Sequence, residues 1–108
     1  GCVSVTSFII PEGIEKIETY AFSGCEKLKN IVIPSSVVEI RTGAFDGCTD
    51  LSTVYFNQTI KPTFGLSCFK KYSGVKTTFY FKNSTVADAF TTSYYNSSYG
   101  TKSTDYNW

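Results

Sequence analysis

The sequence predicts a β-rich solenoid in which each repeat of about 23 residues supplies one short parallel strand. Three observations support this fold class. Apolar positions recur when the chain is shifted by one repeat length, proline follows the first two predicted strands, and glycine precedes the turn into the next unit. The 108 residues suffice for one domain or a short array of repeats.

The repeat is visible as columns of matching residues. A shift by one repeat length places Gly1 on Gly24 and Gly47, and Pro11 on Pro34. The other columns keep one residue class: Cys2, Cys25 and Cys48; Val5, Leu28 and Leu51; Phe8, Ile31 and Val54; Ile10, Ile33 and Phe56; Ile17 and Ile40; Ala21 and Ala44; Phe22 and Phe45. The polar positions between them vary, so we expect regular repeats over residues 1–56.

The period lengthens towards the C-terminus. Ile60 keeps the regular spacing to Val37 in the preceding unit. Cys68 stands one position later than the period predicts from Ala44, and Phe79 stands two positions later than it predicts from Val54. Slippage of this kind indicates small insertions in the loops of a terminal unit, which is expected to be atypical. We therefore expect residues 57–81 to form a degenerate last repeat, so that the repeats span 1–81.

Each unit is expected to bury one row of apolar side chains. Residues 29–33 are rich in β-branched types, and the proline that follows lacks the N–H that a strand ladder needs. Alternation along this strand directs Ile31 and Ile33 inward and leaves Asn30 and Val32 on the outer surface. Equivalent strands stack in parallel about 4.8 Å apart. The stack is expected to wind as a right-handed solenoid in which each unit covers the apolar row of the next.

A C-terminal strand–helix cap is expected, in which residues 82–108 form the helical part and a Tyr/Ser-rich tail. The strand before it contains Phe79 and Phe81, and Thr85 with Asp88 fits a capping box at the start of a short amphipathic helix. One helical face collects Val86, Ala89, Phe90 and Tyr94. Because Cys2 already stands at its repeat position, we expect the chain to be the C-terminal fragment of a longer array.

Composition argues against several functions. The 10 basic and 9 acidic residues nearly balance, so the basic excess of a nucleic-acid-binding protein is missing. The sequence has no histidine, which removes the commonest general base and the usual zinc ligand, and it has no phosphate-binding loop. No apolar run approaches the roughly 20 residues of a membrane span. We expect no enzyme activity, no catalytic, cofactor-binding or metal-binding residue, and no membrane insertion.

The cysteines fit the repeat. Cys2, Cys25 and Cys48 form one column, and Cys68 stands in the small-residue column of Ala44. Stacked cysteines are close enough for a disulfide, but their Cβ vectors run parallel rather than towards each other. We favour buried free thiols over a disulfide framework.

The motif Gly-Cys-x-x-Leu-x-x-Ile-x-Ile-Pro, followed by an apolar pair and Ala-Phe, resembles the BspA-like leucine-rich repeats of secreted and surface proteins in bacteria and some protozoa. The resemblance is close over residues 1–56 and loose over 57–81. It implies a leucine-rich-repeat solenoid at the cell surface or outside the cell. It also implies a protein-binding module of an adhesin, which contacts host or matrix proteins through its exposed strand face.

Two other functions stay open because a repeat scaffold hosts many surfaces. The segment could be a structural cap or spacer of a longer array with no ligand of its own. It could also bind carbohydrate through surface tyrosines.

Stacking of the strands predicts the candidate contact surface. The outward positions form an apolar-to-aromatic column of Ile9, Val32, Tyr55 and Tyr80. A polar column beside it holds Ser7, Asn30, Thr53 and Thr78. A second candidate surface is the aromatic tail, which contains Tyr94, Tyr95, Tyr99, Tyr106 and Trp108. For the tail we favour the alternative that its rings cover the apolar edge of the last repeat.

Overall fold

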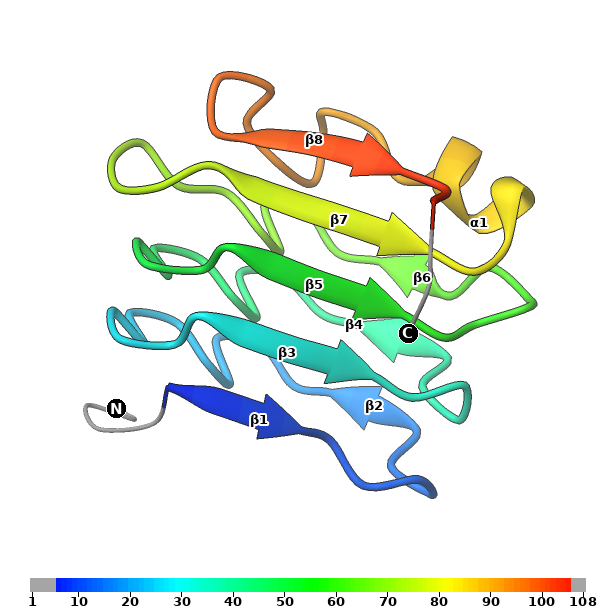
Figure 1. Cartoon of the computed structure of the whole chain (residues 1–108). Helices are drawn as coiled ribbons and strands as arrows, with labels where there is room; N and C mark the ends of the chain where they lie inside the picture. The colour runs from blue at the N-terminus through cyan, green and yellow to red at the C-terminus, as the bar shows by residue number, and fades with distance from the viewer. Residues whose placement is uncertain (1–5, 106–108) are drawn as a thin grey trace.

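Short strands alternate between two parallel sheets that share one core, as the computed structural model shows for residues 6–105 (Figure 1). The larger sheet has the order β1 (Ser7–Ile9), β3 (Asn30–Ile33), β5 (Thr53–Phe56), β7 (Thr77–Phe81) and β8 (Gly100–Ser103). The smaller sheet has the order β2 (Lys16–Ile17), β4 (Glu39–Ile40) and β6 (Thr63–Phe64). A single short helix, α1 (Ser84–Ala89), follows β7.

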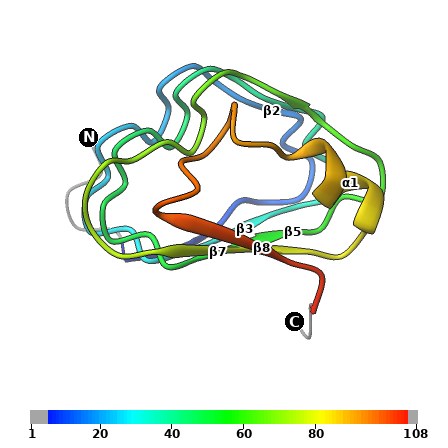
Figure 2. The same ribbon diagram turned by 90° about the horizontal axis from the view of Figure 1, so that it is seen from above.

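Strand register confirms the solenoid predicted from the repeat. Phe8 pairs with Ile31, and Ile31 pairs with Val54, so each step between strands equals the period of the sequence. The next pair, Val54 and Phe79, is separated by a slightly longer stretch of chain. These slips place the small insertions in the loops of the third full turn, and successive turns overlie one another when viewed from above (Figure 2).

A third wall of the coil consists of the turn segments 19–24, 42–47 and 65–70. Backbone hydrogen bonds join them, as Phe22 N donates to Ala44 O and Phe45 N donates to Cys68 O, both at 2.7 Å. Cys68 is therefore the counterpart of Ala44, as predicted. The ring of Phe45 lies between those of Phe22 and Phe69, with centroid distances of 4.9 and 4.7 Å and interplanar angles of 1° and 4°.

The insertion before β6 changes which residue is buried. Ile60, whose spacing predicts the place next to Val37, is 82% exposed. Gln58 is buried instead, and its Nε2 donates to Pro34 O at 3.1 Å and to Val37 O at 3.3 Å. The side-chain amide thus adds a donor to these two carbonyls, and Ile60 does not occupy the place next to Val37 that its spacing indicates.

Helix α1 is capped before the predicted capping box. The side-chain oxygen of Asn83 accepts from Thr85 N at 2.9 Å and from Val86 N at 3.2 Å, so Asn83 is the N-cap. The helix ends at Ala89, and Tyr94 lies beyond it. The predicted helical face is therefore correct for Val86 and wrong for Tyr94.

The sequence pattern did not reveal strand β8, which lies in the expected tail. It continues the larger sheet at the regular repeat spacing, and Thr78 pairs with Thr101. Lys102 stands opposite the buried Phe79, but its Nζ donates to Ala87 O at 2.7 Å and to Phe90 O at 2.9 Å. A cation that binds the last carbonyls of α1 replaces the apolar residue of the regular repeat, because the stack ends here.

The cysteines divide into two groups. Cys48 and Cys68 are buried free thiols, as predicted. Cys25 is disulfide-bonded, so the free-thiol prediction is wrong at that position, and Cys2 lies outside the described residues. The prediction of free thiols assumed that all side chains of the cysteine column point in the same direction. The Sγ of Cys48 instead donates to Phe22 O in the preceding turn, at 3.2 Å.

Candidate protein-binding surface

The outward side chains of the larger sheet form one continuous surface, here called the outer face. It comprises Ser7, Ile9, Asn30, Val32, Thr53, Tyr55, Thr78, Tyr80, Thr101 and Ser103. Every one of these residues is uncharged. The strand registers align Ile9, Val32, Tyr55 and Tyr80 in one column, which confirms the predicted arrangement.

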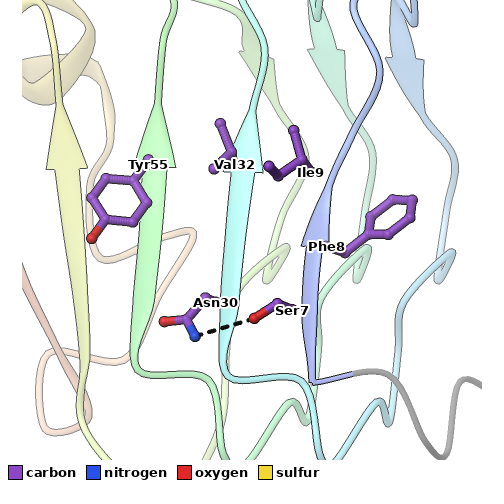
Figure 3. Close-up of a pocket in the computed structure, with 6 residues that line it drawn as sticks. All are labelled: Ser7, Phe8, Ile9, Asn30, Val32 and Tyr55. Atoms are coloured by element: carbon purple, nitrogen blue, oxygen red, sulfur yellow. Dashed lines mark hydrogen bonds between the residues drawn. The ribbon is translucent and has the colours of Figure 1, made fainter. Parts of the chain in front are cut away.

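Side-chain size shapes this apolar column into a groove. Ile9 is 65% exposed, whereas Val32 is only 6% exposed. Figure 3 shows Val32 between Ile9 and Tyr55 on the same side of the sheet, while Phe8 is directed towards the open edge. Val32 therefore forms the floor of a groove of about 290 Å³, lined by Ser7, Phe8, Ile9, Asn30, Val32 and Tyr55. In a contact with a partner, Val32 would therefore form the bottom of the groove instead of protruding into the partner.

The two tyrosines form an aromatic platform over β5 and β7. The ring centroids of Tyr55 and Tyr80 are 5.1 Å apart and the ring planes differ by 14°. Both residues are half-buried. The stacking fixes the rings with respect to each other, so a partner would meet them with little further loss of side-chain freedom.

Hydrogen bonds along the polar column hold its side chains in place. Nδ2 of Asn30 donates to Oγ of Ser7 at 3.5 Å, and Oγ1 of Thr53 donates to Oδ1 of Asn30 (Figure 3 shows the first of these bonds). Thr78 continues the column on β7. The column thus presents ordered donors and acceptors beside the apolar groove.

Groups with chemical reactivity lie away from the outer face and are buried. Burial raises the pKa of the Cys48 thiol to about 11 and that of the Cys68 thiol to about 12. Lys71 is 4% exposed and its Nζ donates to Leu51 O at 2.8 Å, while burial lowers its pKa. These thiols are poor nucleophiles because they stay protonated. Among residues 6–105, no group of three His, Cys, Asp or Glu side chains could hold a metal ion.

The aromatic tail covers the end of the core, which is the alternative that we favoured from the sequence. Tyr95 is 8% exposed and its ring stacks on Phe90 at 4.9 Å. Tyr94 packs against Phe64, with ring centroids 5.2 Å apart. Tyr99 is half-buried, and Tyr106 and Trp108 lie outside the described residues.

Three residues of the surface were not predicted from the sequence. Thr101 extends the polar column onto β8, Ser103 ends the apolar column with a polar side chain beside Tyr80, and Phe8 lines the groove at β1. The regular repeat step from Thr78 to Thr101 is the signal that could have identified β8. We assigned the Phe8 side chain wholly to the core because we assumed that a neighbouring turn covers every inward position.

Comparison with known proteins agrees with the geometry. A family profile described as BspA type leucine rich repeat region matches residues 1–103 in six copies. A search of curated proteins and a search of solved structures returned no match. In the described part of the chain, no helix is long and apolar enough to cross a bilayer. With the repeats covering nearly the whole sequence, the chain belongs to the BspA-type leucine-rich repeat family.

Proposed function

We propose that this chain is a protein-binding module of a cell-surface or secreted adhesin, and that it contacts host or matrix proteins through the outer face. The observation that carries the proposal is the composition of that face. Charged residues make up 18% of the chain, yet the outer face has none. Interface centres are similarly depleted of charge and enriched in tyrosine.

The geometry of the face supports a protein partner. The groove over Val32 accepts an apolar side chain, and the column from Ser7 to Thr78 offers hydrogen bonds to a backbone or a polar side chain beside it. An apolar pocket with ordered polar neighbours is the arrangement in which a few residues carry most of the binding energy. Leucine-rich repeats generally mediate protein interactions, which favours the same interpretation.

Two observations support a location outside the cytosol. The BspA-type family is associated with surface or secreted proteins. The disulfide at Cys25 is typical of an oxidising compartment. The proposal assigns no catalytic role to the chain, consistent with a fold that is typically non-enzymatic.

Binding to an immobilised panel of extracellular-matrix and plasma proteins tests the proposal. The wild-type chain is compared with a Tyr55→Ala/Tyr80→Ala variant whose fold is verified by circular dichroism. Saturable binding that is lost in the variant supports recognition by the outer face. Equal binding by both proteins places recognition elsewhere. If neither protein binds any member of the panel, the result favours the alternative of a structural cap or spacer without a ligand.

Carbohydrate binding is the second candidate, favoured by the two nearly parallel tyrosine rings. The two rings are stacked at a centroid distance of 5.1 Å, so a sugar would meet their edges or the outer face of one ring beside Thr78. Sugar rings stack on such surfaces through their apolar faces. Glycan-array binding that Tyr55→Ala abolishes would support this candidate, and an array without hits beside a positive protein panel would exclude it.

A further inference from the structure

The outer face carries two columns of side chains that run across the strands, and their spacing restricts the conformation of a partner that lies along them. The apolar and polar columns are two residues apart along each strand, as Val32 and Asn30 are on β3 (Figure 3). Successive positions in a column are one strand step apart, about 4.8 Å. A partner that lies between the columns therefore meets apolar groups on one side and polar groups on the other.

The central donors of the polar column lie two strand steps apart. Nδ2 of Asn30 donates one of its two N–H groups to Oγ of Ser7, so that the second N–H can be donated to a partner. The hydroxyl of Thr53, one step further, is used within the column because it donates to Oδ1 of Asn30. The hydroxyl of Thr78 on β7 follows at two steps from Asn30. The donors at Asn30 and Thr78 are therefore about 9.6 Å apart.

The apolar column has the same spacing. The hollow over Val32 lies between Ile9 and Tyr55, which are two strand steps apart. The position two steps beyond Val32 is Tyr80, whose ring stacks on that of Tyr55. An apolar group in the hollow and a second group against the edge of the tyrosine pair would thus also be about 9.6 Å apart.

Among the regular peptide conformations, polyproline II matches this distance. It has three residues per turn and rises about 3.1 Å per residue, so that equivalent residues recur after about 9.3 Å. Two such turns differ from four strand steps by only about 0.6 Å. An extended strand repeats its side chains after about 6.7 Å, and an α-helix completes a turn in about 5.4 Å. Neither of these repeats aligns with donors about 9.6 Å apart.

The chemistry of a proline-rich segment also suits the outer face. The backbone carbonyls of polyproline II have no internal hydrogen bonds, so they can accept from Asn30 and Thr78. Its pyrrolidine rings are uncharged and apolar, and the outer face has no charged residue. Because the conformation is already populated in the free segment, little chain entropy is lost on binding.

We propose that the outer face binds a proline-rich segment in the polyproline II conformation, which lies across β3, β5 and β7 between the two columns. One pyrrolidine ring fills the hollow over Val32, and the ring three residues further on packs against the edge of Tyr80. The carbonyls on the other side accept from Asn30 and Thr78. This inference rests on the proposed function, because it names the class of protein segment that the outer face recognises.

An NMR titration of the isotope-labelled chain with an acetylated nine-residue polyproline amide tests the inference. Saturable shifts should appear at amides of β3, β5 and β7 and should be absent from β2, β4 and β6. The absence of saturable shifts would overturn the inference.

Two further peptides of identical composition test the spacing, each with three prolines and six glutamines. In one peptide the prolines occupy the first, fourth and seventh positions, and they lie on one side of a polyproline II helix. In the other they occupy the first, third and fifth positions, and they are distributed around it. The first peptide should bind at least about fivefold more tightly. Equal affinities would contradict the match of repeats.

Variants of the chain locate the bound peptide. Val32→Phe fills the hollow and should weaken polyproline binding by at least about tenfold. Thr78→Val preserves the shape of the side chain but removes the donor, so it should weaken binding about fivefold. Thr63→Val on β6 is the matched control and should leave binding unchanged. The fold of each variant is verified from its amide spectrum. Wild-type affinity in both Val32→Phe and Thr78→Val would overturn the inference.

The result is separable from that of the proposed function. Binding to a panel protein that is lost in Tyr55→Ala/Tyr80→Ala, without polyproline binding, would uphold the outer face as the recognition surface and overturn the proline specificity. Polyproline binding without a panel ligand would uphold the specificity and count against the matrix and plasma proteins of the panel. Glycan-array binding that is lost in Val32→Phe, without polyproline binding, would overturn the inference in favour of carbohydrate.

Discussion

Replacing Phe45 tests whether the aromatic stack of the third wall stabilises the solenoid as a continuous column. Phe45 is 1% exposed and has a parallel ring on each side, at 4.9 Å towards Phe22 and 4.7 Å towards Phe69. Truncating a buried phenylalanine to alanine costs about 3–5 kcal/mol through lost burial and the cavity left behind. Each stacked pair adds about 0.5–1.5 kcal/mol. We therefore expect Phe45→Ala to cost about 4 kcal/mol or more.

The same substitution at the end of the column gives the matched comparison. Phe22 is only partly buried and has the tilted ring of Phe8, at 5.8 Å, in place of a second parallel ring, so Phe22→Ala should cost about half as much as Phe45→Ala. Both free energies of unfolding are measured by urea titration followed by circular dichroism, with Phe45→Leu as a variant that restores most of the volume. Equal losses at Phe22 and Phe45, or a loss at Phe45 below about 1 kcal/mol, would refute the column.

Three further substitutions probe the thiols and the cap. The folded pKa of Cys68 is raised from 9.0 to about 12, so the unfolded chain loses this proton first and stability should fall as the pH rises above 9.0, by up to about 1.4 kcal/mol per pH unit. Cys68→Ala should remove that part of the slope between urea titrations at pH 8 and about pH 10.5; an unchanged slope would show that the thiol is not protected. Asn83→Ala should cost about 1 kcal/mol in urea through loss of the N-cap, and no loss would mean that the helix is capped otherwise. Lys102→Met should cost about 1–2 kcal/mol and speed exchange of the β8 amides, because Phe90 O loses its side-chain donor and Ala87 O keeps only the Phe90 N–H; unaltered exchange would contradict this role.

The regular part of the fold could be predicted because burial repeats with the period. Residues such as Ile31 and Val54 occupy the same place in successive turns, so one spacing predicts strand, register and inward face together. Strand β8 could not be predicted in this way. Its inward position holds Lys102, which binds carbonyls at the end of the helix, and the apolar signal that defines the other strands is absent there.

The insertion before β6 shows a second limit of the pattern. Ile60 matches the period but is exposed, while Gln58 is buried through its side-chain hydrogen bonds. A hydrophobicity pattern does not indicate that a hydrogen-bonded side-chain amide can be buried where an apolar residue is expected. Sequence spacing therefore predicted burial reliably only in the repeats that contain no inserted residue.

The sequence predicted which residues of the candidate surface align across the strands. It did not predict which side chains protrude and which lie at the bottom of a groove. The column from Ile9 to Tyr80 follows directly from strand register. That Val32 lies at the floor of a groove depends on the larger side chains on either side of it, which a strand pattern treats as equivalent. Whether the surface binds a partner stays a prediction.

A pair of identical substitutions on the two sheets tests the central claim, that the uncharged outer face is the recognition surface. Thr78 lies on the outer face in β7, and Thr63 lies exposed on β6 of the other sheet. The affinity of Thr78→Lys and of Thr63→Lys is measured by surface plasmon resonance for the ligand found in the panel. The account predicts that Thr78→Lys weakens binding by at least about tenfold, which is about 1.4 kcal/mol, while Thr63→Lys leaves it unchanged. Equal affinities for the two variants, or a loss confined to Thr63→Lys, would contradict it.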